Sequence, residues 1–234
     1  MKIITLGCSL THQAGWAEYI SYCTKLPWIN LAQSAGSNQI QQYRFHEYIL
    51  REKVDSSDLV IWQITATHRK HGRTKLDNGW RLKLAKELYL PESLNNNPTI
   101  TKRNKNLFDD GTRIDFLCIS ENADSVKDEE QAIEDLLFHL VTAKKFFPNL
   151  LIIFGWDQVL PAQHLQKFKD LLMSFDIEYI EDTIVDWCEA QQLPMAGSKH
   201  PTQRSYQIYG EQVIMPKINS MLGTEFDILP PWSI

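Results

Sequence analysis

Residues 2–11 read KIITLGCSLT, a short apolar and β-branched run that stops at a small polar turn. An apolar run of this length, bounded by a turn signal, is typical of a strand that is buried on both faces. Gly7 ends the predicted strand, and Ser9 follows two residues later. We therefore expect Ser9 to lie at the carboxyl end of a buried strand.

Similar apolar runs recur along the chain and alternate with amphipathic segments. Further strands are predicted at residues 28–32, 59–64, 150–154 and 177–181. Helices are predicted at residues 15–25, 38–52, 126–147, 162–174 and 204–221, and a loop is predicted from Gly7 to about Ala14. Strands that alternate with helices indicate the α/β class, with a mainly parallel sheet of about five strands and helices on both faces. Sites in such sheets lie at the carboxyl ends of the strands.

The segment from residue 69 to about residue 120 breaks this alternation. It contains glycines, prolines and a run of three asparagines, and only residues 82–90 are predicted to form a short helix within it. Loops of this length inside compact domains are commonly lids or insertions. A chain of 234 residues fits one large domain. We therefore expect a single domain over residues 1–234, with an insertion or lid at 69–120.

The composition excludes several classes of protein. Hydrophobic residues make up 43% and charged residues 23% of the chain, as in ordinary globular proteins rather than disordered ones. The four cysteines form no CxxC pair and no Cys/His cluster, so we expect reduced thiols, no metal and no cofactor. They are Cys8, Cys23, Cys118 and Cys188.

No segment has the features of a signal peptide or of a membrane span. The apolar run at residues 2–6 is too short for a signal peptide. A membrane helix needs about 18 or more consecutive apolar residues, and the sequence contains no such stretch. We therefore expect no contact with a membrane and a cytoplasmic location, or association with a virion that is assembled in the cytoplasm.

Charge is distributed unevenly along the chain. Residues 69–107 contain ten Lys or Arg residues and three acidic residues, a local net charge of +7. The remainder contains 14 basic and 26 acidic residues, a net charge of −12, so that the total is −5. The total argues against a general nucleic-acid coat, but the insertion would attract an anionic ligand. The alternative is a solvated flap whose charge balances the acidic stretch around residues 121–135.

Four turns carry residue types that suit acyl-transfer chemistry. Ser9 is a candidate nucleophile after the first strand, and Gly36 after the second strand would offer its N–H to an oxyanion. Thr67, His68 and Arg69 follow the third strand, and His200, the usual general base for a serine hydroxyl, precedes the last helix. The four segments are Gly7-Cys8-Ser9, Ala35-Gly36-Ser37-Asn38, Thr65-Ala66-Thr67-His68-Arg69 and Ser198-Lys199-His200-Pro201.

These segments, in this order, resemble the sequence blocks of the SGNH (GDSL-type) hydrolase superfamily, including its members in phages and bacteria. The resemblance implies a flavodoxin-like three-layer α/β/α fold and hydrolysis of esters, often acetyl groups on carbohydrates or lipids. It implies that Ser9 is the nucleophile, that the N–H groups of Ser9 and Gly36 form the oxyanion hole, and that His200 is the base. Cys8, however, replaces the aspartate of the first block.

Two further departures from the family pattern concern the catalytic machinery. The third block usually contains an asparagine that donates to the oxyanion, whereas this chain offers the Thr67 hydroxyl as a weaker donor. The aspartate expected two or three residues before the histidine is missing, because Gly197 and Ser198 occupy those positions. A backbone carbonyl, Ser198 or an acid from elsewhere must then orient His200.

Each candidate residue also has a purely structural interpretation. Ser9 would cap a helix or form a turn, and His200 would be a loop histidine with Pro201 opening the next helix. Asn38 either contacts substrate or the oxyanion, or caps the following helix. His68 and Arg69 either contact a substrate anion or lie in a solvated loop. The tail at residues 226–232 either packs on its own domain or binds a partner.

Two functional hypotheses follow. The main hypothesis is a serine esterase with a Ser9–His200 dyad, which acts on a small-molecule or glycan ester and has Asn38, His68 and Arg69 near the substrate. The alternative is a catalytically inactive SGNH-fold module that binds an anionic ligand, or a protein partner such as a virion component, through residues 69–107.

Overall fold

The structure is a computed structural model. It describes residues 1–12, 15–32, 38–52, 54–65, 69–75, 99–106, 113–120, 126–156, 159–160, 162–197 and 200–230.

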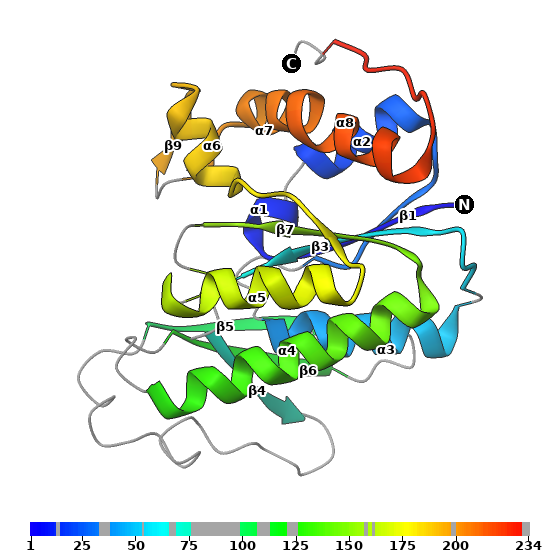
Figure 1. Cartoon of the computed structure of the whole chain (residues 1–234). Helices are drawn as coiled ribbons and strands as arrows, with labels where there is room; N and C mark the ends of the chain where they lie inside the picture. Colours follow the sequence, from blue (N-terminus) through cyan, green and yellow to red (C-terminus); the bar gives the residue numbers. More distant parts are fainter. Residues whose placement is uncertain are drawn as a thin grey trace.

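Five parallel strands form the central sheet (Figure 1). In chain order they are β1 (Ile3–Leu6), β2 (Trp28–Asn30), β3 (Leu59–Ile64), β7 (Asn149–Phe154) and β8 (Glu178–Tyr179). Their spatial order is β2-β1-β3-β7-β8, and every neighbouring pair is parallel. Counted among themselves, the strands follow the order 2-1-3-4-5, which is the flavodoxin-like arrangement. The predicted fold class is confirmed.

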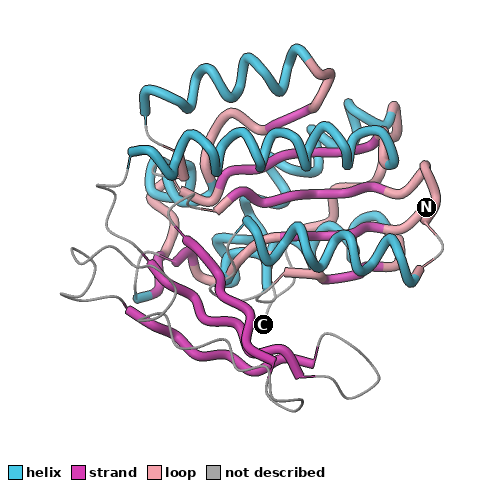
Figure 2. The backbone as a smooth tube through the Cα atoms, turned by 90° about the horizontal axis from the view of Figure 1, so that it is seen from below, coloured by secondary structure: helices cyan, strands magenta, loops and turns pink. Residues whose placement is uncertain are grey.

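Helices cover both faces of this sheet (Figures 1 and 2). One face carries α2 (Trp16–Thr24), α6 (Ile184–Ala190), α7 (Gln203–Tyr209) and α8 (Met215–Leu222). The other face carries α3 (Asn38–Arg51), α4 (Val126–Phe146) and α5 (Ala162–Ser174). Successive strand residues point to opposite faces, so Ile3 and Ile61 pack with the first group of helices, whereas Ile4 and Val60 pack with the second.

Several elements differ from the sequence prediction, and α6 was not predicted at all. The segment from Gly7 to Ala14 was predicted as a loop, but its residues Ser9–His12 form a one-turn helix, α1. The last helix is continuous from α7 to α8 but contains a π-helical turn at Gly210–Ile214. A Cβ atom at Gly210 would lie 2.8 Å from Cδ1 of Tyr19. The glycine therefore lets this turn approach α2 closely.

The segment at residues 69–120 contains three antiparallel strands, β4 (Arg69–Lys75), β5 (Thr99–Asn106) and β6 (Arg113–Ser120). They form a separate sheet in the order β4-β6-β5 (Figure 2). The sequence pattern predicted none of these three strands. β4 and β5 do not alternate apolar with polar residues, which is the usual signal of a half-buried strand. β6 does contain apolar residues (RIDFLCIS), but its strand was not predicted. The helix predicted at residues 82–90 lies outside the described residues.

The C-terminal tail packs on its own domain as far as Leu229. The Tyr19 hydroxyl donates to the carbonyl oxygen of Leu229. The Asn219 side chain accepts from the N–H of Phe226 at 3.0 Å and donates to the carbonyl oxygen of the same residue at 3.1 Å. Of the two interpretations of the tail, the structure therefore supports packing within the chain for residues 226–229.

Cys8, Cys23 and Cys188 are buried free thiols. Burial raises the pKa of the Cys188 thiol to about 12. No helix in the described part of the chain combines the length and apolar character that crossing a membrane requires.

Candidate active site

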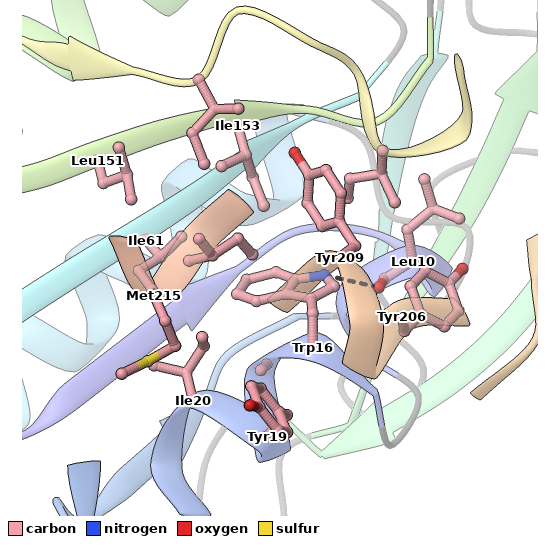
Figure 3. Packing of buried hydrophobic residues seen from close by; sticks show 14 of the residues in the cluster. Leu10, Trp16, Tyr19, Ile20, Ile61, Leu151, Ile153, Tyr206, Tyr209 and Met215 are labelled. Atoms are coloured by element: carbon pink, nitrogen blue, oxygen red, sulfur yellow. Dashed lines mark hydrogen bonds between the residues drawn. The ribbon is translucent and has the colours of Figure 1, made fainter. Parts of the chain in front are cut away.

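Ser9 begins the one-turn helix α1, directly beyond the carboxyl end of β1. The side chain of the next residue, Leu10, is 1% exposed and belongs to the core cluster drawn in Figure 3. The Trp16 indole donates to the carbonyl oxygen of Leu10 at 3.0 Å (Figure 3). The core of the domain thus holds α1 from the side of α2 and leaves Ser9 half-buried.

His200 meets Ser9 across the fold. The Oγ atom of Ser9 and the Nε2 atom of His200 are 2.8 Å apart. A neutral imidazole that is protonated on Nδ1 presents Nε2 as an acceptor, and the serine hydroxyl then donates to it. This arrangement suits removal of the hydroxyl proton during nucleophilic attack.

A short hairpin carries His200. The histidine lies in β10 (His200–Pro201), which pairs antiparallel with β9 (Met195–Ala196), His200 opposite Ala196. The ring of His200 also lies edge-on to the Trp156 ring, with 6.3 Å between the centroids and 77° between the planes.

The hairpin is fixed to the helix that follows. Thr202, rather than Pro201, is the N-cap of α7, and its hydroxyl accepts from the N–H of Ser205. The Thr202 N–H and the Ser205 hydroxyl both donate to the carbonyl oxygen of Pro194, at 3.1 and 2.6 Å. These bonds tie the loop that carries His200 to the start of α7. The interpretation of Pro201 as the opening residue of the helix was wrong.

Asn38 joins the carboxyl end of β3 to the start of α3. Its Nδ2 donates to the carbonyl oxygen of Thr65 at 2.8 Å, and its Oδ1 accepts from the N–H of the same residue at 3.0 Å. The side chain is buried. Both ends of the Asn38 amide are therefore bound to the backbone of residue 65, which keeps two turns at the same sheet edge together.

The remaining predicted site residues are placed only in part. Gly36, Thr67 and His68 lie outside the described residues. Arg69 is the first residue of β4, five residues beyond the end of β3. Gly197, one of the two positions where the family has its aspartate, is exposed. Within the part of the chain that is described, no group of three His, Cys, Asp or Glu side chains is arranged to hold a metal ion.

Gln63 is a site residue that the sequence pattern did not single out. It lies in β3, is fully buried, and its Oε1 accepts from the N–H of Cys8 at 3.0 Å. The same oxygen accepts from the Thr11 hydroxyl at 3.1 Å and from the Cys8 thiol at 3.3 Å. Its position could have been noticed in the sequence, because an amide side chain inside an otherwise apolar strand needs hydrogen-bond partners when it is buried.

Tyr206, in α7, is buried near Cys8. Burial raises the pKa of its phenol, and the nearby thiols of Cys8 and Cys188 raise it further. The phenol is therefore neutral, and it contributes bulk rather than charge beside the turn that carries Ser9.

Comparison with known proteins shows similar structures but no similar sequence. No family model and no curated protein matches the sequence. The chain is similar to G-D-S-L proteins of known structure. One is a member of the lipolytic protein G-D-S-L family from Veillonella parvula, with 14% identity, a TM-score of 0.47, and coverage of 90% of this chain and 95% of that one. A second is a G-D-S-L family protein from Desulfitobacterium hafniense, with 14% identity, a TM-score of 0.47, and coverage of 93% of this chain and 98% of that one.

A third similar structure is the acetyl xylan esterase Est2A from the rumen bacterium Butyrivibrio proteoclasticus. The identity is 12% and the TM-score is 0.48, with coverage of 95% of this chain and 64% of that one, so this chain spans less than two thirds of Est2A. At such identities, the chemistry of this chain has to be argued from its own residues.

Proposed function

We propose that this protein is an SGNH-type serine esterase, in which Ser9 is the nucleophile and His200 is the general base. The observation that carries the proposal is the separation of 2.8 Å between Ser9 Oγ and His200 Nε2. A nucleophile and a base within hydrogen-bond distance are the signature of serine catalysis on unrelated folds. Following the family resemblance, the substrate is an acyl ester, such as an acetyl group on a carbohydrate or polymer.

The reaction proceeds in two halves. Ser9 Oγ attacks the ester carbonyl carbon while His200 takes the hydroxyl proton, and a tetrahedral oxyanion forms. The carbon–oxygen bond to the alcohol then breaks, and His200 returns the proton to the leaving oxygen. In the second half, His200 takes a proton from water, the resulting hydroxide attacks the acyl-Ser9 ester, and the serine departs with that proton.

The oxyanion requires donors that face the substrate. We assign this role to the N–H groups of Ser9 and Gly36, with the Thr67 hydroxyl as a third donor. The N–H of Cys8 is not one of them, because it donates to Gln63. Loss of one oxyanion donor typically lowers the rate about 10²–10³-fold, so a hydroxyl in place of the family's asparagine predicts a slow enzyme.

Hydrolysis of nitrophenyl acetate by the wild type and by Ser9→Ala tests the assignment. We expect Ser9→Ala to abolish the enzymatic rate, because it removes the hydroxyl that lies 2.8 Å from His200 Nε2. Ser174→Ala is the matched control, because the Ser174 hydroxyl only donates to the carbonyl oxygen of Leu171 in the last turn of α5. Equal rates for the wild type and Ser9→Ala would remove Ser9 as the nucleophile.

The esterase is preferred to the inactive binding module. In an inactive module, nothing requires the side chains of Ser9 and His200 to remain in contact. The Thr202 cap and the bonds to Pro194 hold His200 in its loop, and contacts with Leu10 hold the turn that carries Ser9. Both partners of the pair are therefore supported by their surroundings, as a working site requires.

An anionic substrate group bound by the insertion is the second part of the proposal. Alternate residues of a strand lie on the same face of a sheet, and the strand register aligns Arg73 with Phe116 and Arg103, and Lys75 with Ile114 and Lys105. One face of the small sheet therefore includes five basic positions, which are Arg69, Arg73, Lys75, Arg103 and Lys105. A face of this charge attracts a polyanion, such as an acetylated acidic polysaccharide.

Charge reversal tests this face separately from the chemistry. Arg73→Glu with Arg103→Glu should raise KM for an acetylated acidic polysaccharide about tenfold or more, and leave KM for neutral nitrophenyl acetate unchanged. Lys102→Glu is the control, because position 102 aligns with Gly72 and Leu117 on the opposite face. An equal effect of the control would contradict a role for this face.

A further inference from the structure

Ser9 lies in a helix that is too short to be stable by itself. Helix α1 has four residues, and isolated helices of this length are unstable in water. The N–H of Thr11 bonds to the carbonyl oxygen of Cys8, the residue before the helix, at 3.1 Å. The position of Ser9 relative to His200 must therefore come from tertiary contacts on either side of the serine.

Gln63 supplies contacts on both sides. Its Oε1 accepts from the backbone N–H of Cys8, immediately before Ser9, and from the hydroxyl of Thr11, two residues after it. An amide oxygen has two lone pairs, which these two donors fill, so the thiol of Cys8 at 3.3 Å is the third and weakest donor. One side chain thus fixes the turn at two points that flank the nucleophile.

The Gln63 amide is itself fixed in a single orientation. Its Nε2 donates to the carbonyl oxygen of Ile64 at 2.8 Å. If the oxygen and nitrogen of the amide were exchanged, the Nε2 donor would face the N–H donor of Cys8, and the Oε1 acceptor would face the carbonyl oxygen of Ile64. The hydrogen bonds therefore determine the orientation of the amide.

The space around Gln63 is shaped by two glycines. A Cβ atom at Gly7 would lie 2.6 Å from Gln63 Oε1, and one at Gly155 would lie 2.5 Å from Nε2. Gly7 follows β1, and Gly155 follows β7. The ends of three neighbouring strands therefore surround the Gln63 amide closely, together with the side chains of Leu10 and Thr11.

We infer that Gln63 is a positioning residue, which holds the Cys8–Thr11 turn so that Ser9 Oγ meets His200 Nε2. The inference rests on the proposed function, since positioning matters only if Ser9 reacts. It also accounts for the departure at residue 8. The carboxylate of an aspartate at residue 8 would be repelled by Gln63 Oε1, because both are hydrogen-bond acceptors. The Cys8 thiol instead donates to that oxygen.

Gln63→Met tests the inference, because methionine matches glutamine in length and lacks the amide oxygen that accepts from Cys8 and Thr11. We expect kcat for nitrophenyl acetate to fall about 10–100-fold with KM within about threefold, since a small misplacement of a reacting group costs up to about 10²-fold in rate. The control is Gln41→Met, at a buried glutamine whose amide atoms have no hydrogen-bond partner in the described part of the chain. An unchanged kcat in Gln63→Met would overturn the inference, and so would an equal loss in the control.

Thr11 provides an independent test that does not depend on how well Gln63→Met folds. Thr11→Ser keeps the hydroxyl donor and should retain kcat, whereas Thr11→Val removes the donor and should lower kcat several-fold. The double variant Thr11→Val/Gln63→Met should be no slower than Gln63→Met, because both changes act through one bond. Losses that multiply, or equal rates for the serine and valine variants, would contradict positioning through this turn.

Amide hydrogen exchange separates this inference from the proposed function. In Gln63→Met, exchange at Cys8 should become at least tenfold faster than in the wild type, whether or not the protein hydrolyses esters. Equal hydrolysis by the wild type and Ser9→Ala would overturn the esterase proposal alone. Unchanged exchange at Cys8 would overturn the role of Gln63 alone.

Discussion

Ser9 Oγ lies 2.8 Å from His200 Nε2, although 191 residues separate the two in the sequence. The serine follows the first strand of the central sheet, and the histidine lies in a hairpin just before the last helical region. Their meeting depends on the fold as a whole, so changes to the pair and to its supports give the sharpest tests.

Replacing His200 should remove the base and leave the fold intact. We expect His200→Gln to lower kcat about 10²–10⁴-fold, which is the usual contribution of general acid–base catalysis. Steady-state hydrolysis of nitrophenyl acetate measures the effect. His164→Gln, which removes a histidine from α5, is the control and should keep the wild-type rate. A His200→Gln variant as fast as this control would exclude His200 as the base.

Gly155→Ala should disturb both stability and activity. The added methyl group would lie 2.5 Å from Nε2 of Gln63 and 3.0 Å from Cδ1 of Leu10, and overpacking of this kind typically costs about 1–3 kcal/mol. Urea unfolding should show this loss, and kcat should fall as Gln63 is displaced. At Gly197, which is exposed, an added methyl group meets no atom of the described residues within 4 Å, so Gly197→Ala should change the free energy of unfolding by less than about 0.5 kcal/mol. Similar losses in the two variants would show that crowding at Gln63 is not the cause.

Asn219→Ala should release the C-terminal tail. The Asn219 side chain bonds to both backbone groups of Phe226 and to the Thr224 hydroxyl. Its removal leaves these groups without their partner, which typically costs about 1–3 kcal/mol. Urea unfolding should show the loss, and limited proteolysis should cut the tail faster. The comparison is Asn149→Ala, because Asn149 makes one exposed bond, to the carbonyl oxygen of Ser57. A tail that stays resistant in Asn219→Ala would count against this anchor.

Acid should destabilise the protein through His139. Its ring lies 5.2 Å from the ring of His46, centroid to centroid, and burial together with His46 lowers the pKa of His139 below its ordinary 6.5, against an opposing effect of Asp135. The folded state then binds a proton less readily than the unfolded state. The contribution of His139 to stability is therefore complete above pH 6.5 and is lost as the pH falls from there through the lowered pKa.

The urea midpoints of the wild type and His139→Gln at about pH 7.5 and pH 5.5 measure this contribution. The wild type should lose more stability between the two conditions than the variant does. An equal loss in the two proteins would assign the acid sensitivity to other groups.

Much of the fold was predictable because its signals are local. Strand β3 at Leu59–Ile64 and helix α5 at Ala162–Ser174 have the predicted bounds, since a buried apolar run and a helical periodicity are contained within their own residues. Strands β4 and β5 lack such a pattern, and their pairing comes from β6 instead. The one-turn helix α1 likewise left no signal, because it is held by tertiary contacts. Trp16 donates to the carbonyl oxygen of Leu10, and Gln63 accepts from Cys8 and Thr11.

By itself, the sequence determined the alternation of strands and helices and the four turns that carry reactive residue types. Only the tertiary structure decided which of those residues meet. In the structure, Ser9 lies beside His200, Asn38 bonds to the backbone of Thr65, and Gln63 accepts from the N–H of Cys8. The reason is physical: each of these contacts links residues that lie far apart along the chain, and the order β2-β1-β3-β7-β8 brings their strand ends to one edge.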